Sequence, residues 1–385
     1  MHLTDWMERV DLEKEIQEVY LHSFLFKLAV KLVAIFLPLY ILELGFSFQH
    51  VFLFFAVYYG AYIFASLPNA GIVSRIGYKH ASLAASPVIL LFYVLLRQLS
   101  TSNLQLFLVA LTGGIGFNLY WSGMNPEVAT SSHSDDREKE TGYFFSMPAL
   151  ASIFSPFVGG MILAVSGFEI LFLFTLLLVA ASFLPFLFSR EHHDGMDIDI
   201  LEFAGEMETV DFSTFVAKGI NSMGKKVLWP LYLAVIIQNS MSIGGAGSFL
   251  ALGGAVTSIF IGKVTNDGNR TKVIAVGALF ASVSYLLMSQ VTTPGAAMLV
   301  SAMNGLSYTS VSLPIYSKAM DHAEKEDVIE YFAFREIALA IGRIATLGAL
   351  MLAFFLLPQA AAFTAGFFLL AAAIVIIGFL GSRME

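Results

Sequence analysis

The 385-residue chain contains no cysteine. Disulfide bonds, thiolate catalysis and cysteine-ligated metals are therefore excluded. Charged residues are also scarce, at 13% of the sequence, whereas hydrophobic residues make up 57% and the mean hydropathy is +0.76. Because a typical soluble domain is about 25% charged, this composition predicts a chain that lies in a lipid bilayer.

Signatures of ATP-driven and catalytic proteins are missing as well. The phosphate-binding sequence G-x-x-x-x-G-K-[ST] is absent, so ATP hydrolysis is not expected to power the protein. The nearest approach to a clustered acid, base or metal set is residues 127–140, with His133 and Asp135, and it resembles an ordinary loop. We therefore predict no enzyme activity, no cofactor, no metal site and no nucleic-acid partner.

Long apolar stretches fill the sequence. Most of them are near the ~20 residues that a helix needs to cross a hydrocarbon core of about 30 Å. Barrel strands would be about 10 residues long and would alternate in polarity, whereas these stretches are continuously apolar. We therefore predict an all-α polytopic membrane protein with twelve transmembrane helices. The predicted spans are 24–45, 50–73, 81–99, 104–126, 142–166, 169–189, 214–240, 243–264, 272–291, 295–318, 328–356 and 359–381.

The placement of lysine and arginine predicts the orientation, because cytoplasmic loops carry an excess of these residues. With the first helix starting inside, the turns that lie outside contain one basic residue, Arg97. The opposite loops hold Arg75, Lys79, Arg137, Lys139, Arg190, Lys263, Arg270, Lys272, Lys318 and Lys325. Both termini are therefore predicted to be cytoplasmic, in the cell (inner) membrane. The acidic first 20 residues lack a basic apolar leader, so the first spanning helix is expected to direct insertion.

An internal repeat relates the two halves of the chain. Several short motifs recur about 190 residues later in the same order. The matched positions are Pro38-Leu39-Tyr40 with Pro230-Leu231-Tyr232, Tyr120 with Tyr308, and Pro126 with Pro314. Two copies of one unit in a membrane protein are typical of a transporter whose substrate site lies between the halves.

The repeat predicts two six-helix bundles, 21–189 and 213–385. An acidic cytoplasmic segment, 1–20, precedes the first bundle, and an acidic cytoplasmic linker, 190–212, joins the two. A charged, flexible linker is the expected connection between bundles that rock against each other.

The loop between the second and third predicted helices carries Gly71-Ile72-Val73-Ser74-Arg75-Ile76-Gly77-Tyr78-Lys79, and the equivalent loop of the second half carries Asn266-Asp267-Gly268-Asn269-Arg270. These sequences resemble the G-x-x-x-D-R-x-G-R-R pattern of the major facilitator superfamily, and the resemblance covers nearly the whole chain. It implies two bundles related by a parallel pseudo-two-fold axis, and transport by alternating access. Ser74 and Asn266 replace the usual acid, which weakens a charge-dependent latch. The gating candidates that this resemblance names are Ser74, Arg75, Gly77, Lys79, Asn266 and Asp267.

A second superfamily pattern, G-x8-G-x3-G-P-x2-G-G from the fifth helix of many exporters, is matched by small residues at Gly142, Ala151, Ser155-Pro156 and Gly159-Gly160. Small residues let helices approach closely, and a proline releases backbone groups, so the pattern favours a bendable contact between the halves. Proton-linked drug exporters usually place an arginine in the fourth helix. Ala110 stands at that position here, which weakens the drug/proton antiporter interpretation.

Ionisable residues at membrane depth are functional candidates, because placing a charge there costs free energy. Lys31 lies about 21 Å along a helix from Gly45, and thus inside the hydrocarbon core. The same count puts Arg343 and the pair Lys225 and Lys226 at a similar depth. No carboxylate lies clearly at this depth, so the site is predicted to be cationic and to bind an anion. Adjacent residues point about 100° apart on a helix, so we expect only one of the two lysines to face the site.

Polar residues related by the repeat complete the candidate site. Asn118 and Tyr120 in the fourth predicted helix correspond to Asn304 and Tyr308 in the tenth. The repeat predicts that the two tyrosines lie symmetrically across the central cavity. Tyrosines in membrane helices also pack or lie at the interface, so packing is the alternative for each.

Three further residues are gating or coupling candidates. Arg335 and Glu336 lie near the cytoplasmic end of the eleventh predicted helix, and Glu127 lies near that of the fourth. Because adjacent residues on a helix do not face one another, an ion-pair network here is expected to require Glu127 or Lys318.

The sequence therefore predicts a secondary active transporter of a small solute, with an organic or phosphorylated anion as substrate. We expect a monomer whose partners are membrane lipid, the substrate and, for a coupled carrier, an ion. One alternative is an exporter of amphipathic drug-like or lipid-like compounds, favoured by the small residues of the fifth helix and by 36 phenylalanines. An alternative of another class is a non-transporting membrane receptor or a polytopic membrane enzyme.

Overall fold

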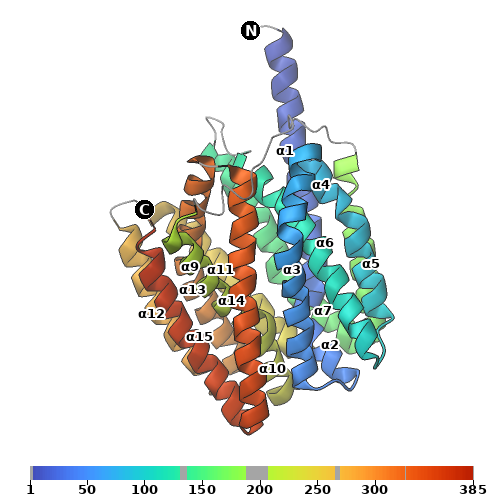
Figure 1. Cartoon of the computed structure of the whole chain (residues 1–385), viewed down its shortest axis with the longest axis vertical. Coiled ribbons are helices and arrows are strands. Elements are labelled where there is room, and N and C mark those ends of the chain that lie inside the picture. The colour runs from blue at the N-terminus through green and yellow to red at the C-terminus, as the bar shows by residue number, and fades with distance from the viewer. Residues whose placement is uncertain (1–2, 131–136, 188–206, 265–268, 326, 385) are drawn as a thin grey trace.

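The computed structural model describes residues 3–130, 137–187, 207–264, 269–325 and 327–384, and this part of the chain is helical without strands (Figure 1). The predicted residues Asn266 and Asp267, and most of the acidic linker, lie outside it. The helices are α1 (Leu3–Ala34), α2 (Leu37–Glu43), α3 (Phe48–Ile76), α4 (Tyr78–Ala84), α5 (Ser86–Arg97), α6 (Asn103–Thr130), α7 (Arg137–Ser182), α9 (Thr209–Met223), α10 (Trp229–Ile236), α11 (Ser240–Val264), α12 (Arg270–Met288), α13 (Pro294–Lys325), α14 (Val328–Leu356) and α15 (Gln359–Gly381), with a 3-10 turn η1 (Pro185–Leu187) and a π-helix η2 (Gly224–Leu228).

The predicted membrane spans agree closely with these helices. In the described part of the chain, nine helical segments are long and apolar enough to cross a membrane. One of them, Ala149–Leu187, holds two predicted spans, because the chain bends at Gly167, whose φ of 77° breaks the helix. Two predicted spans are not among these nine segments. The π-helix η2 interrupts 214–240, and polar side chains lower the hydropathy of 295–318. The all-α polytopic fold is confirmed.

The Pro-Leu-Tyr repeat has one structural role in both halves. Each proline begins a new helical segment, α2 at Pro38 and α10 at Pro230, after an interruption of the first helix of its half. Each following tyrosine donates to backbone carbonyls at or just after the end of the third helix of the same half: Tyr40 to Leu96 at 2.9 Å, and Tyr232 to Ser289 at 3.2 Å and Val291 at 2.9 Å. The last carbonyls of a helix lack partners inside it. The repeated tyrosine therefore supplies a hydrogen-bond donor to the same region of the backbone in each half.

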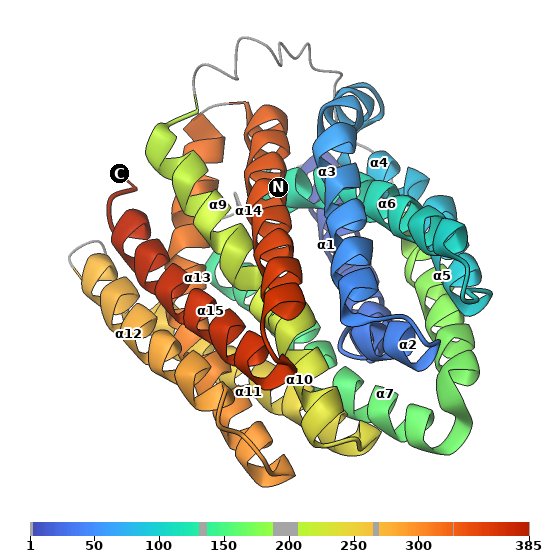
Figure 2. The same cartoon turned by 60° about the horizontal axis from the view of Figure 1, so that its bottom comes forward.

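The two halves meet along two pairs of helices. α14 packs against α3, and α11 packs against α7, while α9 lies on the other side of α14 (Figure 2). The α7–α11 contact is built on glycine. A Cβ atom at Gly244 would overlap the carbonyl oxygen of Pro156, and one at Gly160 would overlap that of Ser240. Of the small-residue pattern predicted in the fifth helix, Pro156 and Gly160 therefore lie between the halves, whereas Gly159 packs against Leu32 of the first half.

α3 begins and α14 ends at the end of the molecule opposite to the one where α1 begins (Figure 1), and aromatic side chains join the two halves there. The ring of Phe354 lies 5.0 Å from that of Phe48 and 5.1 Å from that of Phe52. Phe363 packs on both Phe48 and Phe354. These rings close this end of the contact between α3 and α14.

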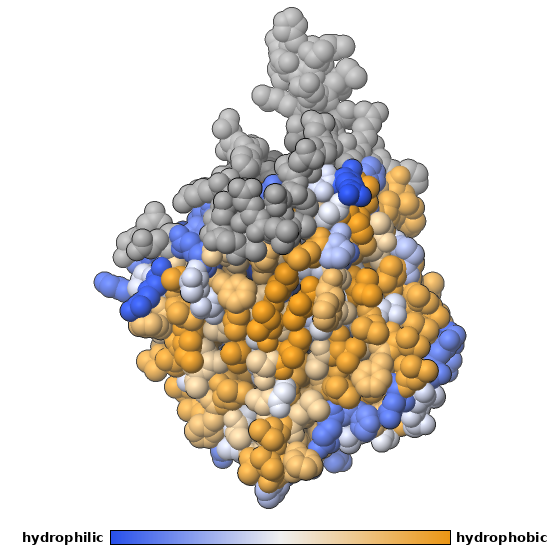
Figure 3. Space-filling model, in the orientation of Figure 1, coloured by the Kyte–Doolittle hydropathy of each residue, from blue (hydrophilic) through white to orange (hydrophobic). Residues whose placement is uncertain are grey.

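The surface carries an apolar belt. Figure 3 shows hydrophobic residues across the middle of one face, with hydrophilic residues gathered toward the upper and lower edges. The exposed hydrophobic side chains of the protein include Phe64, Val165 and Phe355. A belt of this kind is stable only where lipid covers it, so the protein is a multi-pass membrane protein.

Candidate functional site

The first helix of the second half changes its hydrogen-bonding pattern where it carries two lysines. Residues Gly224–Leu228 form the π-helix η2, a rare geometry that is frequent at functional sites. Lys225 Nζ lies 3.1 Å from the centre of the Tyr308 ring on α13, and Lys226 Nζ donates to the Tyr59 hydroxyl on α3 at 3.1 Å. The expectation that only one of the two lysines could face the site is wrong, because the π-helix and long side chains let them reach opposite walls.

Arg343 joins the same group from α14. Its guanidinium lies 4.7 Å from the centre of the Tyr59 ring and 5.7 Å from that of Tyr62, and the residue is 7% exposed. Lys226 and Arg343 thus share Tyr59. A cation over a tyrosine face is attracted by the ring quadrupole, so α3 of the first half holds cations of the second.

Lys31 supplies a cation from the first half. It lies on α1 within electrostatic reach of both Lys225 and Lys226, yet its side chain is exposed, as is that of Lys226. The exposure of side chains that lie between the two bundles means that solvent reaches this space. The structure therefore brings Lys31, Lys225, Lys226 and Arg343 together, as their predicted depth implied.

Two further cations extend the group toward the end where α1 begins. Lys218 on α9 donates to the Ser312 carbonyl on α13 at 3.4 Å. Arg335 on α14 lies over Phe215, Tyr316 and Phe332, with its guanidinium 5.4 to 5.8 Å from the ring centres. Lys218 was missed by the sequence analysis, although its place seven residues before Lys225 puts both on one helical face. We call Lys31, Lys218, Lys225, Lys226, Arg335 and Arg343 the cation cluster.

Glu336 provides the negative charge of this group. Its Oε1 lies 3.1 Å from Arg335 Nη1, and its Oε2 lies 3.5 Å from Arg343 Nη1. The expectation that adjacent residues could not pair is wrong, because the long arginine side chain folds along the helix to reach the carboxylate. The expected partners are engaged elsewhere: Glu127 lies 3.9 Å from Lys79, and Lys318 donates to the Met384 carbonyl.

The polar candidates of the first half lie inside its own bundle. Asn118 accepts from Asn69 at 2.7 Å and donates to Ser66 at 2.9 Å, which ties α6 to α3. Tyr120 contacts the His22 ring nitrogen Nε2 at 3.0 Å through its hydroxyl and is buried. Tyr120 therefore does not face Tyr308 across the cluster, and this prediction is wrong, because helix rotation turned it toward α1.

The corresponding residues of the second half differ. Asn304 donates to Ser284 at 2.8 Å and so joins α13 to α12. Tyr308, four residues further along, lies under Lys225. Of the two asparagines and two tyrosines related by the repeat, only Tyr308 contacts the cation cluster in the described part of the chain.

Four of the predicted gating residues, Ser74, Arg75, Gly77 and Lys79, lie at or next to the turn between α3 and α4. Gly77 has φ 86°, which side chains rarely adopt, and Ser74 Oγ donates to the Gly71 carbonyl at 3.2 Å. Arg75 is exposed, whereas Lys79 is buried beside Glu127. The predicted glycine turn is confirmed, and a gating role for these residues stays a prediction.

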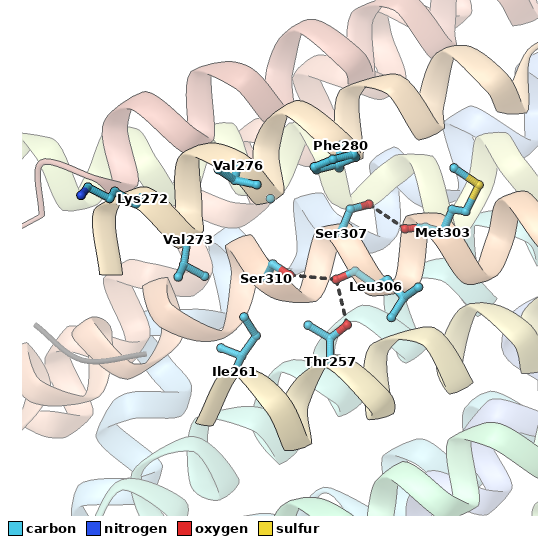
Figure 4. A pocket seen from close by; sticks show the side chains of 11 residues that line it. Thr257, Ile261, Lys272, Val273, Val276, Phe280, Met303, Leu306, Ser307 and Ser310 are labelled. Atoms are coloured by element: carbon cyan, nitrogen blue, oxygen red, sulfur yellow. Dashed lines mark hydrogen bonds between the residues drawn. The ribbon is translucent and has the colours of Figure 1, made fainter. Parts of the chain in front are cut away.

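A separate apolar groove of about 550 Å³ lies on the outside of the second half, between α11, α12 and α13 (Figure 4). Its hydroxyl groups are turned to backbone carbonyls: Thr257 and Ser310 donate to Leu306 at 3.1 Å, and Ser307 donates to Met303 at 2.7 Å. The groove offers a polar ligand few free groups, so the cation cluster is the better candidate for a substrate site.

Sequence comparisons agree with this architecture. The model of the Major Facilitator Superfamily matches residues 19–200. The multi-drug resistance efflux pump PmrA homolog of Lactococcus lactis subsp. lactis (strain IL1403) is 23% identical over 345 residues, which are 81% of this chain and 81% of that protein.

Solved structures share the fold. The human organic anion transporter MFSD10 (TETRAN) aligns over 96% of this chain and 99% of its own, with a TM-score of 0.65 and 14% identity. A POT family transporter in complex with a thioalcohol-conjugated peptide aligns over 94% of both chains, with a TM-score of 0.72 and 16% identity. The nucleoside transporter NupG aligns over 96% of this chain and 99% of its own, with a TM-score of 0.70 and 14% identity.

Packed membrane helices with polar residues between the two halves of the chain are typical of a polytopic membrane transporter. The family-model match over residues 19–200 and the shared fold make this chain similar to transporters of the major facilitator superfamily.

Proposed function

We propose that the protein moves a small organic or phosphorylated anion across the cell membrane by alternating access, with the anion bound at the cation cluster. The observation that carries this proposal is charge. Six cations from α1, α9, η2 and α14 form one group, which reaches Tyr59 of the first half through Lys226 and Arg343. Within the described residues, Glu336 is the carboxylate that contacts them. An anion entering this space would relieve their mutual repulsion.

The residues of the cluster suit different parts of such a substrate. Arg343 offers a planar fork of donors for a carboxylate or phosphate, whereas Lys31, Lys225 and Lys226 act as point charges that can follow a moving group. Tyr59 and Tyr308 add aromatic faces to the walls. Because Lys31 belongs to one bundle and Arg343 to the other, a bound anion would link the halves that must move relative to each other.

The proposed mechanism assigns roles to the remaining parts of the chain. The bundles 21–189 and 213–385 rock about the cluster, with 190–212 as their cytoplasmic linker and 1–20 as a cytoplasmic segment. The phenylalanine contacts around Phe354 seal the outer end, and the turn at Gly77 with the Lys79–Glu127 pair lies at the inner end. Both termini are cytoplasmic, and the monomer is the working unit.

Uptake of labelled carboxylates and phosphorylated metabolites into sealed vesicles tests the proposal. The double substitution Lys31→Ala with Arg343→Ala should abolish uptake of the transported anion. Arg97→Ala is the matched control, because this arginine pairs with Glu169 on an exposed surface at 2.6 Å, away from the cluster, and it should leave uptake unchanged. Uptake that survives the double substitution would refute an anion site here.

A second candidate is efflux of amphipathic compounds. The Lactococcus lactis relative carries the name of a multi-drug resistance efflux pump, and the walls of the cluster include the aromatic rings of Tyr58, Tyr59 and Tyr62. Expression in a drug-sensitive host measures this activity directly. A gain of resistance, with no transport of anions by the purified protein, would favour efflux over the anion proposal.

A further inference from the structure

Glu336 occupies an unusual place in the cation cluster. One of its oxygens points to Arg335 Nη1 at 3.1 Å, and the other points to Arg343 Nη1 at 3.5 Å. A single carboxylate therefore bridges two guanidinium groups that lie eight residues apart on α14. All three residues are buried, with 7% or 8% of their surface exposed.

The two arginines are held in place without Glu336. Arg343 lies over Tyr59 and Tyr62, and Arg335 lies over Phe332 and two other rings. Contacts between a guanidinium and an aromatic face are attractive in their own right. If the carboxylate moved away, both guanidinium groups would still face the same gap.

The bridge leaves donors unused. Each guanidinium carries five N–H donors, and the Nε atoms of both Arg335 and Arg343 are buried without a hydrogen-bond partner in the described structure. The contact to Arg343, at 3.5 Å, is also long for a charged hydrogen bond, which is usually about 2.7–2.9 Å. The two arginines therefore have N–H donors left over that could bind an anion, and Glu336 contacts Arg343 only at a long distance.

A displaced Glu336 would still have partners. Lys218 and Lys226 both lie within electrostatic reach of its carboxylate. Moving from the arginines to a lysine would keep the glutamate compensated, so exchange would not leave an isolated buried charge, which is the costly outcome.

We propose that Glu336 is an internal stand-in for the substrate: its carboxylate bridges Arg335 and Arg343 in the empty transporter, and a carboxylate of the substrate takes its place there. This inference rests on the anion-transport proposal and narrows it to substrates that carry a carboxylate, because a planar group with two oxygens is what the bridge accommodates. It also makes substrate affinity a competition, in which Glu336 weakens binding and keeps the empty site electrically balanced.

Calorimetric titration of the purified full-length protein with succinate, citrate and benzoate tests the competition. Glu336→Gln removes the competing charge and keeps the side-chain shape, so it should bind at least one of these carboxylates at least ten times more tightly than the wild type. Glu169→Gln is the matched control, since it removes an exposed carboxylate next to an arginine, and it should bind as the wild type does.

Thermal unfolding separates the proposed role from a purely structural one. Without ligand, Glu336→Gln should unfold at a lower temperature, because two buried arginines lose their counter-ion. The carboxylate should then raise the unfolding temperature more than it does in the wild type. A merely structural glutamate would give the first effect without the second. Glu336→Asp provides a second variant that keeps the charge on a shorter side chain, and its affinity should lie between the other two.

The outcomes distinguish this inference from the proposal beneath it. If the wild type binds a carboxylate and Arg343→Ala does not, but Glu336→Gln and Glu336→Asp bind no more tightly, the stand-in role is refuted and anion transport remains. If none of the proteins binds any of the three carboxylates, the stand-in role is refuted. Anion transport is then retained only if vesicles containing the wild type take up a phosphorylated metabolite or another anion, and it is refuted if they take up none.

Discussion

The two halves share a frame but differ in what they bury. In the first half, buried polar groups satisfy one another: His22 contacts the Ser182 carbonyl at 2.7 Å and the Tyr120 hydroxyl at 3.0 Å, and Asn118 bonds two neighbours. In the second half, the corresponding space contains charges, including Lys225, Arg335 and Arg343. Neutral hydrogen bonds are inexpensive to bury, whereas charges are not. The first half therefore supplies neutral, hydrogen-bonded packing together with one cation of the cluster, Lys31, whereas the second half supplies the other five cations.

The repeat shows how this difference is encoded. Positions that match, such as Tyr40 with Tyr232, make the same backbone contact in both halves. Positions that do not match carry the charges: Lys31 corresponds to Met223, and Arg343 to Ser155. In these examples, residues that are identical in the two halves support the fold, whereas the charged residues of the candidate site stand at positions where the halves differ.

The largest effect is expected at Arg343, the buried cation of the second half. Arg343→Ala should weaken binding of the transported anion by about 100-fold, or about 2.7 kcal/mol, which lies within the range of about 1.5–3 kcal/mol that a hydrogen bond to a charged group contributes. Arg343→Lys should recover part of the affinity, because it restores charge without the fork. Calorimetric titration measures both. Equal anion affinity in the wild type, Arg343→Ala and Arg343→Lys would show that Arg343 does not bind the anion.

The next effect is expected at Tyr120, in the hydrogen-bonded half. Tyr120→Phe leaves the ring nitrogen of buried His22 without its partner, which should lower the free energy of unfolding by about 1–3 kcal/mol. Anion affinity should not change, because Tyr120 lies away from the cation cluster. Thermal unfolding and titration on the same sample check the two statements. A weaker affinity would show that Tyr120 reaches the substrate after all.

A smaller effect is expected at Lys226. Lys226→Met keeps most of the apolar stem and removes the charge that bonds Tyr59. Because this lysine is exposed and acts as one point charge among several, affinity should fall by about tenfold, or about 1.4 kcal/mol. The decrease should shrink as salt concentration rises. Titration at two ionic strengths tests this, and a decrease that does not depend on salt would contradict it.

The smallest effects should be equal in the two halves. Tyr40→Phe and Tyr232→Phe each remove one hydroxyl donor, which serves one carbonyl in the first half and is shared by two in the second. Each substitution should therefore cost about 0.5–1.5 kcal/mol of stability and leave affinity intact. Parallel thermal unfolding of the two variants compares the halves directly. A large loss of transport in only one of them would break the equivalence that the repeat implies.

The sequence predicted the helical membrane fold because this fold depends on patterns that extend over many residues. Span length predicts the membrane helices, which the structure confirms, and the Pro-Leu-Tyr repeat predicts the division into two bundles. The depth of Lys31, Lys225, Lys226 and Arg343 could also be counted from helix ends, and the structure places these residues together.

Other features depend on helix rotation and side-chain reach, which residue spacing does not specify. Tyr120 turns into its own bundle rather than toward Tyr308. The π-helix at Gly224–Leu228 changes how two adjacent lysines point. Arg335 folds back to a neighbouring glutamate, a contact that an ideal helix does not offer.

The central claim is that charge selects the substrate, and the most direct measurement compares carboxylates with their amides. Each carboxylate that the purified protein binds should be titrated beside its neutral amide of the same shape, such as succinate beside succinamide. The cation cluster predicts that the carboxylate binds at least ten times more tightly, and that Arg343→Ala removes the difference. Equal binding of acid and amide by the wild-type protein would contradict the account.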